Sequence, residues 1–180
     1  SIAGGYKSAL AGEGACFQHG PPAFAPRPRN TGWYAGFGAL SAAPGAVAYG
    51  EDGSRFMGAT FDPSGLYRMR ASLRWLDEQG LDAAAVHAHS VALQERFAAG
   101  LEERPVGALS PDRLVVPLAK EARGNFLTFE HPNAQDWYRR LHAAGIVTDV
   151  RGTRLRVGFG LYHATEDVDA LLARLREVAP

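Results

Sequence analysis

Residues 146–159 read IVTDVRGTRLRVGF. Apolar, β-branched residues stand on both sides of Arg151-Gly152-Thr153, and such runs joined by a glycine-containing turn are typical of a β-hairpin. The pattern predicts a strand over 146–150, a turn, and a partner strand over 154–159. The hairpin would belong to a small sheet in the C-terminal part of the chain.

The second predicted strand has one apolar and one basic face. Leu155, Val157 and Phe159 share one side, and Arg154 and Arg156 the other, because alternate side chains of a strand point to opposite faces. An arginine on such a face offers a planar fork of N–H donors that binds a carboxylate in a bidentate manner. Arg156 is therefore a candidate carboxylate-binding residue. A solvated arginine at the strand edge is the alternative, and it suits Arg154 better.

Further elements are predicted on both sides of this hairpin. They are strands over 114–118 and 125–129, a helix from Asn133 to Gly145 with Trp137 and Leu141 inward, and a last helix from Thr165. The apolar face of the last helix consists of Val168, Leu171, Leu172, Leu175 and Val178. Strands mixed with covering helices predict an α/β layer over residues 104–180.

Two helices are predicted before this layer, within residues 61–103. Asp62-Pro63 is an N-cap followed by proline at the first helical position, and Gly80 ends the helix. Leu66, Met69, Leu73 and Leu76 share one of its faces. The second helix spans about 82–101, with Val86, Leu93, Phe97 and Leu101 on one side, and Gly100 as an alternative end.

Residues 1–60 are rich in glycine and proline and show no helical period. Ala15-Cys16-Phe17 predicts one strand, whose sheet partners we expect elsewhere, with Cys16 as a small buried residue. A loop-rich segment of this length is uncommon unless it is functional or packs on another part of the protein. We therefore expect the sequence to be the C-terminal portion of a longer enzyme.

Composition excludes several classes of function. The chain has 180 residues with 46% hydrophobic and 21% charged residues, which is a globular balance, and its 19 basic residues match its 19 acidic ones. This neutral balance predicts neither nucleic acid nor an anionic membrane as partner. A single cysteine excludes an intrachain disulfide framework and a multi-cysteine zinc site, and no metal site is expected from the spacing of the histidines. We expect a cytoplasmic protein.

Gly4-Gly5-Tyr6-Lys7, followed by Ala11-Gly12-Glu13-Gly14, is the sharpest local motif. A lysine in glycine-rich backbone can form a Schiff base with a carbonyl, and glycine lets the backbone pass close to a bulky cofactor. On spacing alone, a surface lysine in a turn remains the alternative.

The order of several motifs carries a family resemblance. The motifs are Gly5-Tyr6-Lys7 with Ala11-Gly12-Glu13-Gly14, Asn30-Thr31-Gly32-Trp33, residues 55–60 (RFMGAT), Asp149-Val150-Arg151, Leu155-Arg156-Val157, and Leu161-Tyr162-His163 with Asp167-Val168. Together they resemble class V aminotransferases of the pyridoxal-phosphate-dependent fold-type-I superfamily, in their kynureninase-like branch. The resemblance implies an α/β fold with the end of the large domain in residues 1–60, connecting helices in 61–103, and the small domain in 104–180.

The resemblance also implies roles for single residues. Lys7 would carry pyridoxal 5'-phosphate as a Schiff base and shuttle a proton, and Tyr6 would contact the phosphate and assist that transfer. Trp33 and Thr60 match positions that reach the cofactor or substrate from the neighbouring subunit, which implies a homodimer with shared sites. Arg156 matches the residue that binds the substrate carboxylate. The alternatives are a packed tyrosine, an interface tryptophan, a turn threonine and a solvated arginine.

The function predicted from these matches is that of a pyridoxal-phosphate-dependent aminotransferase acting on an amino acid or small amine. A kynureninase-like C–C hydrolase is the alternative enzyme, although Thr60 stands where kynureninases typically carry asparagine. Desulfurase chemistry is not expected, because Cys16 lies nine positions after Lys7 and not on a distant downstream loop. A non-catalytic fragment or dimerisation module is the alternative outside enzymes, and we expect the isolated chain to lack measurable activity.

Overall fold

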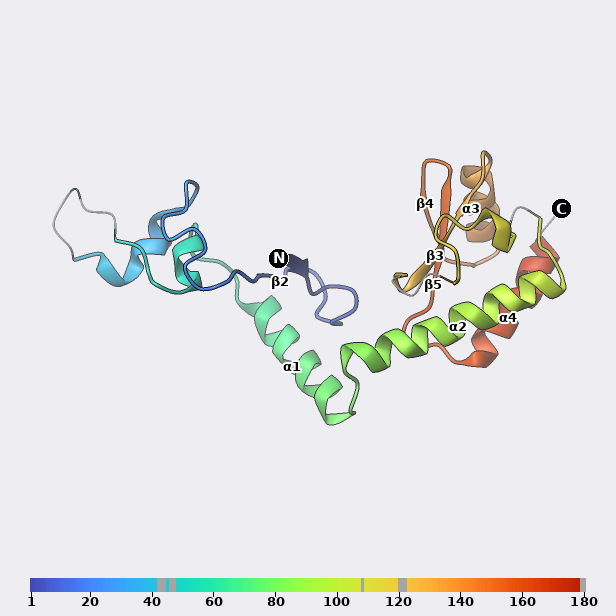
Figure 1. Ribbon diagram of the computed structural model, residues 1–180, viewed down its shortest axis with the longest axis horizontal. Coiled ribbons are helices and arrows are strands. Elements are labelled where there is room, and N and C mark those ends of the chain that lie inside the picture. Colours follow the sequence, from blue (N-terminus) through green and yellow to red (C-terminus); the bar gives the residue numbers. More distant parts are fainter. Residues whose placement is uncertain (42–44, 46–47, 108, 120–122, 179–180) are drawn as a thin grey trace. The chain divides into compact units, whose positions relative to one another are not determined.

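The computed structural model describes residues 1–41, 45, 48–107, 109–119 and 123–178. These form two compact units, Ser1–Gln79 and Gly80–Pro180, which are considered separately (Figure 1). The helix over residues 64–78 belongs to the first unit and the next helix to the second. The division into 1–60, 61–103 and 104–180 stays a prediction.

The first unit begins with a two-stranded antiparallel ribbon. Strand β1 (Ile2–Gly4) pairs with β2 (Cys16–Gln18), so the predicted strand is confirmed with a shift of one residue. The expectation that its partners lie elsewhere is wrong, because Ile2–Gly4 supplies one. Cys16 is exposed, contrary to the prediction, since neither face of β2 is covered in this unit.

Short 3-10 helices η1 (Trp33–Ala39) and η2 (Gly53–Phe56) follow, and then helix α1 (Ser64–Glu78). The N-cap of α1 is Pro63 and not Asp62, so the helix begins one residue later than predicted, although the Asp62 carboxylate accepts the backbone N–H of Ser64 at 2.9 Å. On the predicted apolar face Leu76 is buried, whereas Leu66 and Leu73 are 44% and 45% exposed. The helix itself therefore follows from local sequence, while the burial of its face does not.

The second unit begins with helix α2 (Ala83–Glu103), whose first turn is capped by Asp82 through a 2.7 Å bond from the Ala85 N–H. Helix α4 (Thr165–Val178) packs against it. Gly100 does not end α2, which continues to Glu103. The glycine instead permits close packing of α4, because a Cβ at this position would collide with the side chain of Leu172. None of the helices in the described parts of the chain is long and apolar enough to cross a membrane.

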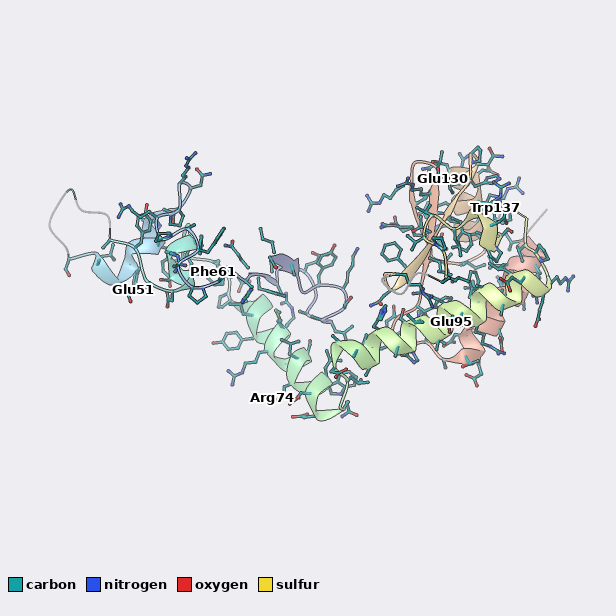
Figure 2. The ribbon with its side chains drawn as sticks, in the orientation of Figure 1. Glu51, Phe61, Arg74, Glu95, Glu130 and Trp137 are labelled. Carbon is teal, nitrogen blue, oxygen red and sulfur yellow. The ribbon has the colours of Figure 1, made fainter. Side chains whose placement is uncertain are left out.

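A three-stranded antiparallel sheet lies in the same unit, in the order β3-β5-β4 (Figure 1). Its strands are β3 (Phe126–Glu130), β4 (Asp149–Arg151) and β5 (Arg154–Gly158), and helix α3 (Ala134–Ala143) lies between β3 and β4 in the chain. The predicted hairpin is confirmed, but β4 begins at Asp149 and not at Ile146, and it includes Arg151, which was predicted as a turn residue. The predicted inward residues of α3 are also buried, and one of them, Trp137, is labelled in Figure 2.

The predicted strand over 114–118 is wrong. A 3-10 turn, η3 (Pro111–Arg113), precedes it, and only Leu114 forms an isolated bridge, with Phe129. Leu114 and Leu118 are partly buried against the core, whereas Val115 and Val116 are 41% and 39% exposed, so the run packs on the unit without forming a strand of the ladder.

The core of the second unit joins one face of the sheet to the inner faces of α2, α3 and α4. Its buried members are Leu93, Phe97, Leu101, Val106, Leu109, Leu127, Phe129, Ala134, Trp137, Leu141, Leu155, Val157, Phe159, Val168, Leu172 and Leu175. The opposite face of the sheet stays free of this core and carries Arg154 and Arg156.

Candidate functional site

The loop that carries Lys7 is closed at its base by backbone hydrogen bonds. The Gly5 N–H donates to the Ala15 carbonyl at 2.7 Å, and the Ala11 N–H donates to the Gly5 carbonyl at 3.0 Å. Ala11 and Ala15 are both 1% exposed, so the base of the loop is packed. The excursion over residues 5–15 is therefore a defined structure and not a free tail.

Helix α1 clamps this loop from the side. The Arg68 guanidinium donates to the carbonyls of Ala11 at 3.2 Å and Glu13 at 2.6 Å, and the Ser72 hydroxyl donates to the Leu10 carbonyl at 3.0 Å. Gly12 and Gly14 have φ angles of +68° and +86°, a region that only glycine enters at low cost. The Ala-Gly-Glu-Gly motif thus gives the loop the shape that Arg68 holds.

Lys7 and Tyr6 stand together on this loop with accessible side chains. The Lys7 Nζ lies 5.2 Å from the centroid of the Tyr6 ring, and Tyr6 is 44% exposed. Within the described ranges, the Lys7 amine has no ion pair. The structure therefore presents an exposed amine near an exposed tyrosine ring, both accessible to a ligand.

The motifs at residues 30–33 and 55–60 lie against each other. The Thr31 hydroxyl lies 3.1 Å from the carbonyls of Arg55 and of Met57, each within hydrogen-bond distance. A Cβ on Gly32 would collide with the backbone of Gly58, so only glycine permits this approach. Next to this contact, Trp33 is 54% exposed and Thr60 is also exposed.

Arg55 organises this pair of loops, a role that sequence reasoning missed. Its side chain is buried, and its guanidinium donates to the carbonyls of Glu51 at 2.6 Å, Asp52 at 2.7 Å and Phe24 at 2.9 Å. A buried arginine bound only to carbonyls has a structural role, because it links the segments that carry those carbonyls. No sequence pattern distinguished Arg55 from a surface arginine.

In the second unit, Arg156 stands on the central strand β5, directly opposite Thr128 on β3 and Asp149 on β4. Its Nη2 donates to the Asp149 carboxylate, and its guanidinium carbon lies 5.2 Å from the centroid of the Phe126 ring. The side chain is 27% exposed. The predicted separation of an apolar and a basic face is confirmed, since Leu155 and Val157 are buried on the other side.

The partners of Arg156 were not singled out from the sequence, because the predicted three-residue turn Arg151-Gly152-Thr153 gives a different register from the one observed. A two-residue turn at Gly152-Thr153 fixes the pairing of the hairpin, because register follows from loop length. That register sets Arg151 opposite Arg154, and therefore Asp149 opposite Arg156.

Buried polar side chains of α2 hold the loop that leads into Phe126. The Ser90 hydroxyl lies 3.2 Å from the Phe159 carbonyl and 3.4 Å from the Asn125 carbonyl, each within hydrogen-bond distance. The Gln94 amide donates to the Gly124 carbonyl at 3.0 Å, and Nδ1 of the partly buried His87 lies 2.7 Å from Asn125 Oδ1. His87 is thus engaged with an amide. No group of three metal-ligating side chains is gathered in the parts of the chain that the structure describes.

Comparisons with known proteins decide the family. The kynureninase C-terminal domain matches residues 86–175. This chain belongs to that family. The resemblance stated from the motifs is therefore confirmed, including its assignment to the C-terminal portion of such enzymes. The matched residues include Arg156 but not Lys7, Tyr6, Trp33 or Thr60.

Curated relatives agree over the same region. Kynureninase from Burkholderia mallei is 37% identical over 99 residues, which is 54% of this chain and 23% of that protein. Kynureninase from Deinococcus radiodurans is 35% identical over 100 residues, or 54% of this chain and 24% of the relative. The aligned part spans about a quarter of each relative.

Solved structures show the fold. The cysteine desulfurase of Thermococcus onnurineus NA1 matches with a TM-score of 0.61 and 19% identity, covering 76% of this chain and 36% of that one. The cystine C-S lyase C-DES, solved with its product cysteine persulfide, matches with a TM-score of 0.64 and 20% identity over 85% of this chain and 39% of the other. The predicted fold class, α/β of fold type I, is confirmed.

Kynureninases and cysteine desulfurases are pyridoxal phosphate enzymes, so the predicted cofactor is that of the family. The residues of this chain fit such a group by their chemistry. An accessible amine at Lys7 can bind a carbonyl carbon, and the hydroxyls of Tyr6 and Thr60 can donate to a phosphate. Trp33 offers a flat exposed ring.

Proposed function

We propose that this chain supplies a lysine loop and a carboxylate-binding sheet to a pyridoxal-phosphate-dependent enzyme that acts on an amino acid. The observation that carries the proposal is Arg156, an accessible guanidinium on the open face of the sheet, inside the region that matches the kynureninase C-terminal domain. A guanidinium fork binds a carboxylate, such as the α-carboxylate of an amino acid, through two parallel hydrogen bonds.

Each residue has a distinct task in this proposal. Lys7 would hold the cofactor through its amine and exchange a proton with the substrate Cα, and Tyr6 would bind the phosphate through its hydroxyl. Arg156 would bind the substrate carboxylate and so orient the bonds at Cα. The cofactor supplies an electron sink for the negative charge that develops at that carbon.

Kynureninase-type C–C hydrolysis is the reaction that the family match favours, and transamination is the second candidate. The match covers residues 86–175, so it does not include the loops that carry Lys7 and Thr60. Thr60 departs from the asparagine typical of kynureninases, and a shorter side chain without an amide suits a different substrate. The complete gene product should be assayed for both reactions, and whichever has the higher kcat/KM decides between them.

A homodimer with shared sites belongs to the same proposal, as does a cytoplasmic location. Trp33 and Thr60 lie exposed on paired loops, which suits residues that serve a neighbouring subunit. Sedimentation equilibrium of the complete gene product should give twice the monomer mass. Mixing subunits that carry Lys7→Ala with subunits that carry Thr60→Ala should restore part of the activity, because one site in each mixed dimer would be intact.

Borohydride trapping tests the role of Lys7 directly. Lys7 and Lys120 are the two lysines of the chain, so the control variant is unambiguous. After incubation with pyridoxal phosphate and reduction, peptide mass mapping should place the adduct on Lys7, and Lys120→Arg should leave its yield unchanged. An adduct confined to Lys120 or the N-terminus, or equal labelling of Lys7→Ala, would contradict the proposal.

A further inference from the structure

Asp149 and Phe126 hold the Arg156 guanidinium from two directions. We propose that Asp149 is a positioning residue, which fixes the orientation of Arg156 so that the remaining guanidinium donors meet a substrate carboxylate. This inference rests on the proposed function, because it assigns the carboxylate to Arg156. It adds a residue that acts through the arginine and does not itself touch the substrate.

The first contact is set by the sheet. Asp149 on β4 is the register partner of Arg156 on β5, and its Oδ2 accepts from Arg156 Nη2. Directly opposite residues of an antiparallel pair are close enough for side chains on one face to interact. The register of the two strands therefore places Asp149 next to Arg156, so their ion pair joins side chains that the backbone already holds close together.

The second contact comes from β3. The Arg156 guanidinium carbon lies 5.2 Å from the centroid of the Phe126 ring, within the range of a cation–π interaction. An aromatic face on one side and a carboxylate at one edge restrict both the position and the rotation of the planar group.

The guanidinium retains donors for a ligand. It carries five N–H groups, and in the described part of the chain only Nη2 has a hydrogen-bond partner. Because a carboxylate needs two donors for a bidentate contact, one engaged nitrogen leaves enough for a second carboxylate.

Arg151 offsets the repulsion that the Asp149 carboxylate would exert on a substrate carboxylate bound at Arg156. Its Nε lies 3.5 Å from the same Asp149 oxygen that binds Arg156. The cluster therefore holds two guanidinium groups and one carboxylate, and its net positive charge still attracts an anion.

A neighbouring ion pair on the same face supplies a matched control. Arg154 donates to Glu130 at 2.8 Å, also across the β3–β5 ladder, and its side chain is 57% exposed. Glu130, labelled in Figure 2, stands opposite Arg154 and not opposite Arg156. Glu130→Gln thus removes a cross-strand ion pair of the same kind without removing the partner of Arg156.

The experiment compares Asp149→Asn, Asp149→Glu and Glu130→Gln with the wild type. In the 180-residue chain, the ¹⁵N order parameter of Arg156 Nε should be high in the wild type and in Glu130→Gln. It should fall in Asp149→Asn and recover in part in Asp149→Glu, which retains the negative charge. Urea midpoints of all variants show whether the fold is kept, and the glutamate variant keeps the test informative if the asparagine variant unfolds.

Activity of the complete gene product gives the second readout. Losing a fixed orientation should raise KM for the amino acid about threefold to tenfold in Asp149→Asn and leave kcat within about twofold, because ordering a flexible side chain then opposes binding. An unchanged Arg156 order parameter would overturn the positioning role and leave the proposed function intact. A lost order parameter with unchanged KM would also overturn the positioning role, because substrate binding would then not depend on a fixed Arg156, whereas the proposed function itself fails if Arg156→Ala leaves KM unchanged.

Discussion

Gly100→Ala tests a close contact between α2 and α4 in the second unit, where two effects of opposite sign act on stability. Alanine is favoured over glycine in a helix interior by about 1 kcal/mol, which alone predicts a more stable protein. The added Cβ, however, would collide with a terminal methyl of Leu172 and lie 3.3 and 3.4 Å from two further atoms of that side chain.

The collision is costly because Leu172 cannot easily move. Its side chain is 5% exposed and belongs to the core between α2 and α4. Adding a methyl group to a packed core typically costs 1–3 kcal/mol, so the net effect of Gly100→Ala is a loss of about 0–2 kcal/mol.

A double-mutant cycle with Leu172→Ala separates the two effects. Leu172→Ala alone should cost about 2–5 kcal/mol through the lost side chain. Once that side chain is absent, Gly100→Ala should become stabilising by about 1 kcal/mol, which leaves a coupling energy of about 1–3 kcal/mol between the positions.

The assay is urea unfolding followed by Trp137 fluorescence. Trp33 and Trp75, both exposed in the first unit, are replaced by phenylalanine so that the buried Trp137 reports on the second unit alone. A single Gly100→Ala variant that is more stable than its background, with no coupling to Leu172, would refute the close helix approach.

Other predictions concern the lysine loop, the exposed thiol and acid stability. Arg68→Ala should speed hydrogen exchange over residues 5–15 by removing two carbonyl contacts, whereas unchanged exchange would contradict the clamp. Cys16 is exposed and should react with Ellman's reagent in the native chain nearly as fast as in urea; strong protection would show that β2 is covered. The hydrogen bond from Arg96 holds the pKa of Asp169 below its ordinary value, so its stabilising effect is complete above the unfolded pKa and is lost as pH falls through the folded one. The urea midpoint should therefore fall on acidification through about pH 4 and below, and it should fall less in Asp169→Asn.

Several helix ends could be predicted because their causes are local, although α2 continues past the predicted Leu101 to Glu103. Asp82 caps its helix through an N–H three residues away, and Gly145 follows the end of α3 with φ of +77°. Such interactions involve neighbours in the chain, so the sequence carries them without knowledge of the fold.

Strand pairing and burial were predicted less well because their causes are distant. The apolar run over 114–118 looks like a strand, yet only Leu114 finds a ladder partner. Cys16 looks like a buried residue, yet its strand pairs only with β1 and is uncovered in its own unit. A pattern states which side chains share a face, but it does not state what covers that face.

The residues of the candidate site fall into the same two groups, those with local signals and those with distant contacts. The sequence by itself predicted Lys7 and Tyr6 as candidate site residues through their motif and the family resemblance, and Arg156 through alternation along its strand, because these signals depend on adjacent residues. Only the tertiary structure brought Arg68 to the lysine loop and Phe126 to Arg156, since those contacts join segments whose separation in the chain hides their proximity. Asp149 belongs with these tertiary contacts: the predicted turn Arg151-Gly152-Thr153 is one residue longer than the turn of the folded hairpin, and only the observed register sets Asp149 opposite Arg156.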